Sequence, residues 1–143
     1  MVFAPEAAPK DREGFLAWYE QQVQWSEGLD YNDPSNTTEP LQNWFLAMIK
    51  AFPPMNGPLR SDDFDDAHLS DYAIGRHVIY TAFAWSLVEE AHVTTRELAA
   101  KHGVGFFDAS GDGSIFIPEN GDLVLLGAPS GNTSKKKSKW KFW

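Results

Sequence analysis

Hydrophobic positions along the chain follow two different periods, and their order predicts the elements of the fold. Residues 78–85 are β-branched and aromatic, as in a buried strand, and residues 104–107 have the same character. Between them, apolar or packing positions recur at three- and four-residue spacing, which is typical of a helix. These positions are Val88, Ala91, Thr95, Leu98, Ala99 and His102. The segment predicts a strand, a helix and a strand, with a connection long enough to join parallel strands.

Both ends of this helix carry local signals. Ser86-Leu87-Val88-Glu89 has the pattern of a capping box, in which the Ser86 hydroxyl bonds the Glu89 amide, so we expect the helix to begin there. Gly103 occupies the position at which helices commonly end in a left-handed residue. The predicted helix therefore covers residues 86–102.

The sequence before this unit predicts two more strands and two more helices. Residues 1–4 are apolar and precede a proline, and residues 72–77 turn at Gly75-Arg76 into the strand at 78–85; one long strand with a bulge at Gly75 is the alternative. A helix is expected within residues 9–26, and a second begins at Thr38. Its hydrophobic positions are Leu41, Trp44, Phe45, Met48, Ile49 and Phe52, and Pro53-Pro54 ends it.

A final hairpin strand at residues 114–117 completes the order β-α-α-β-β-α-β plus a C-terminal hairpin strand. This order predicts an α+β fold with a ferredoxin-like, mainly antiparallel sheet and its helices on one face. No glycine-rich phosphate loop joins a strand to a helix, which disfavours a nucleotide-binding Rossmann or P-loop fold.

Length and composition refine this interpretation. The 143 residues divide into one α+β domain at 1–126, a flexible linker at 127–134 and a basic and aromatic tail at 135–143. The chain has no cysteine, which excludes disulfides and thiolate sites. We expect a cytoplasmic protein, because neither a signal peptide nor an apolar run long enough for a transmembrane segment is visible.

Charge is distributed unevenly along the chain. Five of the twelve basic residues lie in the tail, whereas all twenty acidic residues lie before it. The body is therefore strongly acidic, which disfavours nucleic acid and favours cationic partners. Solubility alone is the simpler explanation for such a charge.

The acidic residues are densest between the second helix and the strands that follow it. Four carboxylates flank one aromatic residue there, which would suit docking onto a basic protein surface. These candidate partner-binding residues are Asp62, Asp63, Phe64, Asp65 and Asp66. A solvated loop without a function is the alternative.

Residues 108–119 match the spacing of a calcium-binding loop, with Asp108, Asp112 and Glu119 at three of its ligand positions. The flanking helices of an EF-hand are absent from the sequence pattern, since glycine and proline surround the segment. We therefore expect a hairpin, in which Phe106-Phe107 pairs with residues 115–117, and we expect no metal site.

No catalytic signature is present, and the four histidines have no metal-ligand spacing. His92 is expected to pair with exposed charges on its helix. The protein is expected to be non-catalytic and to need no cofactor. The alternative, a cofactor-free enzyme or small-ligand-binding protein, would use a group drawn from Asp71, His77, Tyr80 and Asp108.

The tail places aromatic residues among lysines, in the run KKKSKWKFW. Trp140 and Trp143 are candidate partner-binding residues, and the tail would dock on the acidic body or on a partner, with a second copy in a homodimer as one such partner. Weak contact with a membrane surface is the alternative.

The runs DREGFLAWYEQQVQW, FPPMNGP, DYAIGRHVIYTAFAW and AAKHGVGFFD resemble a family of small, uncharacterised bacterial cytosolic α+β proteins. The resemblance covers residues 1–118. Some members of that family look like immunity proteins encoded beside secreted toxins. The resemblance implies a cytoplasmic protein that binds and neutralises a protein partner, most concretely an acidic immunity-type inhibitor of a toxin with a basic surface.

Overall fold

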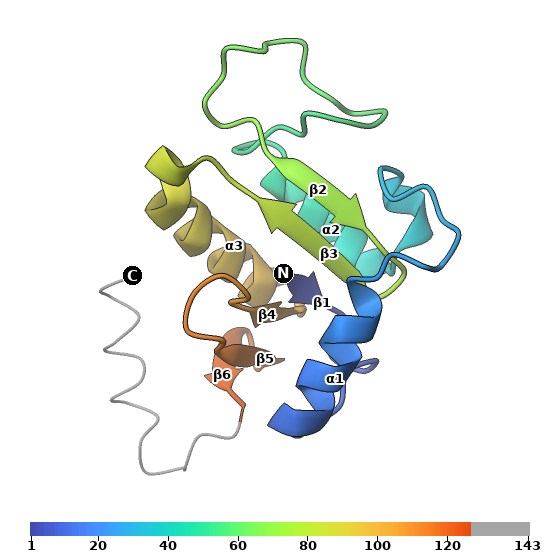
Figure 1. The fold of residues 1–143 in the computed structure, drawn as a ribbon. Helices are drawn as coiled ribbons and strands as arrows, with labels where there is room; N and C mark the ends of the chain where they lie inside the picture. The colour runs from blue at the N-terminus through green and yellow to red at the C-terminus, as the bar shows by residue number, and fades with distance from the viewer. Residues whose placement is uncertain (127–143) are drawn as a thin grey trace.

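The structure, a computed structural model that describes residues 1–126, has an α+β fold built on one six-stranded antiparallel open sheet (Figure 1). The strands are β1 (Val2–Phe3), β2 (Asp71–Ile74), β3 (Val78–Ala82), β4 (Gly105–Phe107), β5 (Ile115–Glu119) and β6 (Asp122–Leu125). The described helices are α1 (Arg12–Gln22), α2 (Glu39–Met48) and α3 (Val88–His102), with short 3₁₀ turns η1 (Pro34–Asn36) and η2 (Trp85–Leu87). In the sheet the strands follow the order β2-β3-β1-β4-β5-β6.

The shortest strand, β1, lies in the interior of the sheet. Val2 pairs with Ile79 of β3 on one side and with Phe106 of β4 on the other, and both pairings are antiparallel. Strands β3 and β4 therefore point in the same direction without being neighbours. Helix α3 connects them, as the strand-helix-strand pattern predicted.

The helices cover both faces of the sheet, so the expectation that they share one face is wrong. Successive strand residues point to opposite faces, and Val2 packs with α2 and α3 whereas Phe3 packs with α1. Figure 1 shows α1 in front of the sheet and α2 behind it. Phe15 of α1 is fully buried against Phe3, with ring centroids 4.9 Å apart. The sheet thus has two hydrophobic faces and needs a helix on each.

Two predicted hairpins are confirmed. Strands β2 and β3 are separate and antiparallel, with Ile74 opposite Ile79, so the single bulged strand is excluded. Strands β4 and β5 pair with Phe106 opposite Phe116 and Phe107 opposite Ile115. The structure has one more strand, β6, which was not predicted. It turns back on β5 through Asn120 and Gly121, which both have positive φ.

The predicted start of α3 is wrong and its predicted end is confirmed. Residues 85–87 form a 3₁₀ turn in which the Leu87 amide donates to the Ala84 carbonyl, and α3 begins after it without a side-chain cap. Ser86 lies inside that turn and does not act as the N-cap. At the other end, Gly103 has a φ of 69° and closes the helix after His102.

Within residues 1–126, no helix is long and apolar enough to cross a lipid bilayer. The predicted linker, the predicted tail and its candidate residues Trp140 and Trp143 lie outside the described residues.

Candidate functional site

A cavity of about 360 Å³ opens between α3, the end of β3 and the turn that follows β4. One wall comes from residues 80–83 and another from the first two turns of α3, and residues 106–111 close the third side. The aromatic lining residues are Tyr80, Phe83, Trp85, Phe106 and Phe107. The polar side chains among the lining are those of Tyr80, Thr81, His92, Thr95, Asp108 and Ser110.

The turn after β4 holds Asp108 in place. Its backbone amide donates to the Ser114 carbonyl at 3.0 Å, and its carbonyl accepts from the Gly113 amide at 3.1 Å. The carboxylate accepts from the Asp112 amide at 3.4 Å. A β-carbon at position 111 would overlap this carboxylate, so a residue larger than glycine there would force the Asp108 side chain to move. Asp108 is consequently almost fully buried, with 3% of its surface exposed.

Burial shifts the titration of the groups around Asp108. Desolvation raises the pKa of Asp108, and nearby His92 opposes this shift. Desolvation likewise lowers the pKa of His92, and the charge of Asp108 opposes the change. The Met1 amino group, which donates to the Phe107 carbonyl at 2.9 Å, has its pKa lowered to about 5 by burial. The cavity therefore brings a carboxylate and an imidazole together in a poorly solvated, mainly apolar space.

Two of the four residues considered for an enzyme meet in this cavity. Tyr80 and Asp108 line it, whereas Asp71 and His77 do not. His92 was predicted to be solvent-exposed, and this is wrong: it is half-buried, and its ring lies 6.1 Å from that of Phe106.

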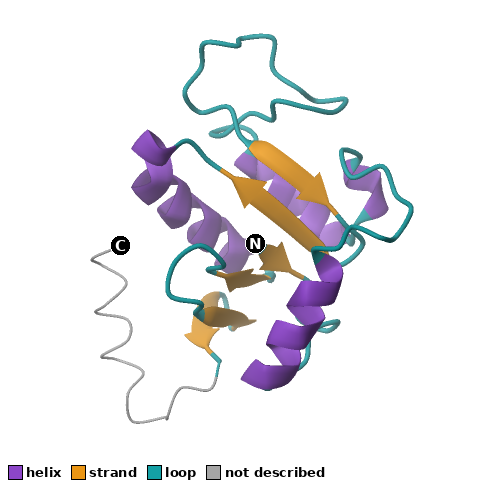
Figure 2. Cartoon of the chain, viewed as in Figure 1, coloured by secondary structure: helices purple, strands orange, loops and turns teal. Residues whose placement is uncertain are grey.

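The loop between α2 and β2, residues 53–70, forms a second feature at one end of the molecule (Figures 1 and 2). Its two ends are joined, because the Met55 amide donates to the Ser70 carbonyl and the Ser70 amide donates to the Pro53 carbonyl. His68 ties the loop to α3 through Glu90, with Nε2 and Oε2 3.4 Å apart. The loop is therefore anchored at its base and projects between its anchors.

The predicted partner-binding residues fall into two groups. Asp62, Asp63, Phe64 and Asp65 are exposed, and Phe64 has 80% of its surface in solvent. Asp66 is half-buried, and its carboxylate accepts from the His68 amide at 2.9 Å and lies 3.3 Å from the His68 ring. Asp66 thus shapes the loop, while the other four residues are presented to solvent.

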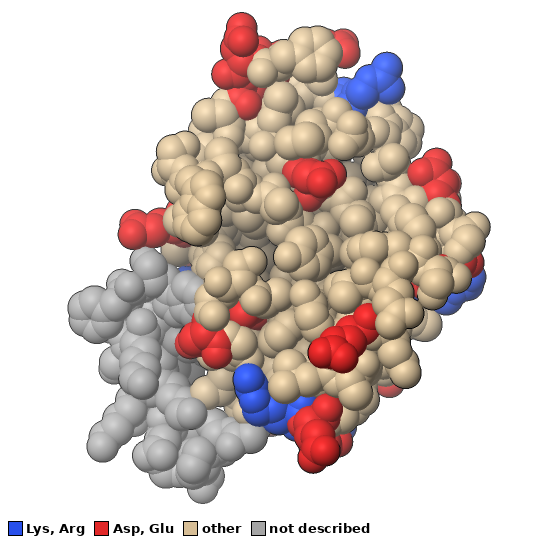
Figure 3. Space-filling view, in the orientation of Figure 1, with Lys and Arg blue, Asp and Glu red and all other residues tan. Residues whose placement is uncertain are grey.

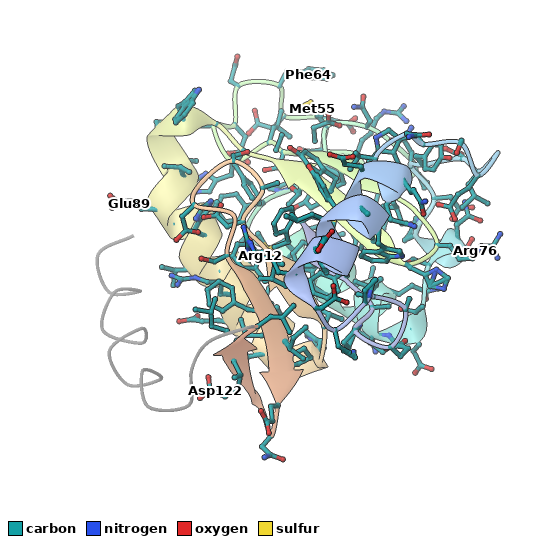
Figure 4. The ribbon with its side chains drawn as sticks, turned by 60° about the horizontal axis from the view of Figure 1, so that its bottom comes forward. Arg12, Met55, Phe64, Arg76, Glu89 and Asp122 are labelled. Carbon is teal, nitrogen blue, oxygen red and sulfur yellow. The ribbon has the colours of Figure 1, made fainter. Side chains whose placement is uncertain are left out.

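Sequence reasoning missed two exposed apolar residues of the same loop. Met55 and Leu59 have 41% and 45% of their surfaces exposed. Figure 4 shows Met55 and Phe64 at the same end of the molecule, and Figure 3 shows acidic side chains around that end. The signal was present in the sequence, since both residues stand beside glycine or proline in a segment that lacks any hydrophobic period.

The segment that matches a calcium loop is the β4–β5 hairpin, and the described residues contain no group of three or more side chains that could hold a metal ion. Titration with millimolar calcium is expected to leave the melting temperature unchanged, because no helices converge the carboxylates on one ion. Thermal melts with calcium and with magnesium test this. A rise of several degrees with calcium that disappears in Asp112→Ala would contradict the expectation.

The class of protein defined so far is an α+β protein with an open antiparallel sheet, an apolar cavity at one end and an acidic loop beside it. Comparison of the chain with protein-family models, with curated proteins and with solved structures found no match.

Proposed function

We propose that this protein is a non-catalytic protein-binding module that uses the 53–70 loop to engage a partner with a basic surface. One observation carries the proposal: Phe64 is 80% exposed and stands between exposed acidic residues on a loop whose base is anchored. Covering an exposed aromatic side chain lowers the free energy of the complex, and the flanking carboxylates orient a cationic partner.

The geometry of the loop supports this role. Hydrogen bonds within the loop already hold its acidic segment, including those from the Asp63 amide to Ser61 Oγ at 3.1 Å and from the Asp66 amide to the Asp63 carbonyl at 3.3 Å. A loop that is ordered before binding loses less conformational entropy on association. Met55 and Leu59 add exposed apolar area to the same loop. The partner surface would therefore combine cationic groups with an apolar pocket for Phe64.

The most concrete form of this proposal is an immunity-type protein that neutralises a bacterial toxin by covering a basic surface or active site. It is supported by the resemblance of residues 1–118 to a family in which some members look like immunity proteins, and by the excess of acidic over basic residues. Coexpression with the products of adjacent genes tests it. Protection of growth and recovery of a complex are expected for one of them, and absence of both for every product would overturn the proposal.

Phe64→Ala is expected to weaken that complex by at least tenfold without changing the melting temperature, because the side chain is exposed in the free protein. Replacing Asp62, Asp63 and Asp65 together by asparagine should mainly slow association and reduce its dependence on salt. Binding kinetics at two ionic strengths measure both effects.

The matched control for Phe64→Ala is Leu46→Ala, which removes a half-exposed apolar side chain from α2. It should leave affinity unchanged. Equal affinities for the Phe64→Ala protein and the unsubstituted protein would contradict the assignment of the loop.

We further propose that the first four strands form a ferredoxin-like core. The order β4-β1-β3-β2 and the connection of β3 to β4 through α3 support this assignment. In this scheme β5 and β6 extend the sheet beyond β4, and α1 is an addition on the opposite face.

A further inference from the structure

The cavity contains a buried polar group that the fold leaves unsatisfied. The Thr95 hydroxyl is inaccessible to solvent and has no hydrogen-bond partner within residues 1–126. Nearly all buried polar groups in folded proteins are hydrogen-bonded, because an unmade bond in the interior is costly. Thr95 lines the cavity, but its hydroxyl is closed to a water-sized probe, so a molecule inside the cavity becomes its partner only when the side chain turns toward that space.

The walls around this hydroxyl favour a flat, apolar ligand. Phe106 is buried on the floor, and Trp85 has 90% of its surface exposed at the rim. Aromatic rings prefer to contact one another in offset or edge-to-face arrangements, which these walls offer to an incoming ring. A volume of about 360 Å³ lies at the lower end of the range for small-molecule sites, which suits one or two fused rings.

The polar side of the cavity selects the chemistry of the ligand. The buried Asp108 carboxylate receives one long hydrogen bond from the Asp112 amide, and a carboxylate can accept several more. A ligand with an N–H or O–H group would therefore find acceptors in Asp108 and in the Thr95 hydroxyl. A purely hydrocarbon ligand would leave the Thr95 hydroxyl without a partner and the Asp108 carboxylate with only its bond from the Asp112 amide.

We propose that the cavity between α3, β3 and the β4–β5 turn binds a small planar aromatic molecule that carries an N–H or O–H donor, such as an indole or a phenol. The ring lies against Phe106 and Trp85, and the donor faces Asp108 and Thr95. This site is separate from the 53–70 loop, because none of that loop's residues line the cavity.

Titration of the full chain with indole and with 1-methylindole, followed by amide chemical shifts in NMR spectra, tests the proposal. Indole should shift amides of lining residues such as His92 and Gly111, and 1-methylindole, which lacks the donor, should bind at least tenfold more weakly. Phe64→Ala should leave indole binding unchanged. Equal binding of both probes, or no shift up to millimolar indole, would overturn the proposal.

Thr95→Val removes the hydroxyl at nearly constant volume. It should weaken indole binding several-fold and raise the melting temperature of the ligand-free protein, because no unsatisfied hydroxyl is then buried. The matched control is Thr94→Val, since the Thr94 hydroxyl donates to the Glu90 carbonyl at 2.9 Å and does not line the cavity. Unchanged indole affinity in Thr95→Val would contradict the role of that residue, and the comparison of the two probes remains decisive if the variant does not fold.

Discussion

Replacing Trp44 by alanine is expected to lower the free energy of unfolding by about 4 kcal/mol, within the range for deleting a fully buried tryptophan. Trp44 has no exposed surface, and its indole packs edge-on against Tyr72 with ring centroids 6.4 Å apart. Its Nε1 donates to the Thr95 carbonyl of α3 at 3.2 Å. The side chain thus joins α2 to α3 as well as to the sheet, and chemical denaturation would measure the loss.

Two variants separate the causes of this loss. Leu46→Ala lies on the same helix but at a half-exposed position, and it should cost less than about 1 kcal/mol. Trp44→Phe keeps most of the buried ring and removes the hydrogen bond to Thr95. Its loss in the free energy of unfolding should therefore lie between those of Trp44→Ala and Leu46→Ala. A similar cost for Trp44→Ala and Leu46→Ala would show that α2 does not pack as described.

Gly105→Ala is expected to lower the free energy of unfolding by about 3 kcal/mol, near the upper end of the usual range for overpacking a core. A β-carbon at this position would overlap the ring of Phe3, which pairs directly opposite on β1 and is fully buried. The ring cannot move aside easily, because Phe15 and Trp18 pack against it with centroids 4.9 Å and 6.1 Å away. Thermal melts of the variant provide the measurement.

A double variant tests whether that contact is the cause. Phe3→Leu shortens the side chain that the new methyl group meets, so Gly105→Ala combined with Phe3→Leu should cost less than the sum of the two single changes. Strict additivity would mean that the loss in Gly105→Ala arises from the backbone rather than from the ring of Phe3.

Local signals in the sequence predicted most elements of the fold but not how the helices are distributed. Gly103 ends α3, Thr38 precedes α2, and the turn at Gly75 joins β2 to β3, because each is determined by neighbours in the chain. Adjacent apolar residues such as Val78-Ile79 and Phe106-Phe107 point to opposite faces of the sheet, so the sequence did indicate strands buried on both sides. It did not indicate that α1 covers one face while α2 and α3 cover the other, because that arrangement depends on contacts between distant segments.

One missed element had a readable signal. Asn120-Gly121 is the dipeptide preferred in two-residue hairpin turns, and it is followed by Leu123, Val124 and Leu125. The capping-box motif, by contrast, predicted a cap that does not form, because Ser86 lies in the η2 turn beside the exposed Trp85. A motif of four residues therefore carries less weight than the tertiary contacts of the elements around it.

The two candidate sites also differ in how far the sequence could predict them. The acidic loop was visible because its residues are contiguous, although the separate role of Asp66 depends on its contact with His68. The cavity was predicted only in part: Tyr80 and Asp108 were grouped with Asp71 and His77, which do not line it, and the contribution of His92 from α3 was missed. Thr95 was counted among the packing positions of its helix. That it lies beside a cavity could be seen only in the folded structure.

The position of β1 also bears on how quickly the sheet can assemble. Its two neighbours in the sheet, β3 and β4, begin at Val78 and Gly105, so both of its pairings close long loops. Closing such loops costs entropy before any contact is gained, which slows folding relative to proteins with mostly local contacts. During synthesis, β1 would leave the ribosome before both of its partner strands and would stay unpaired until they had emerged. The β2–β3 and β4–β5 hairpins can form earlier, and docking β1 between them would be the late step that completes both hydrophobic faces.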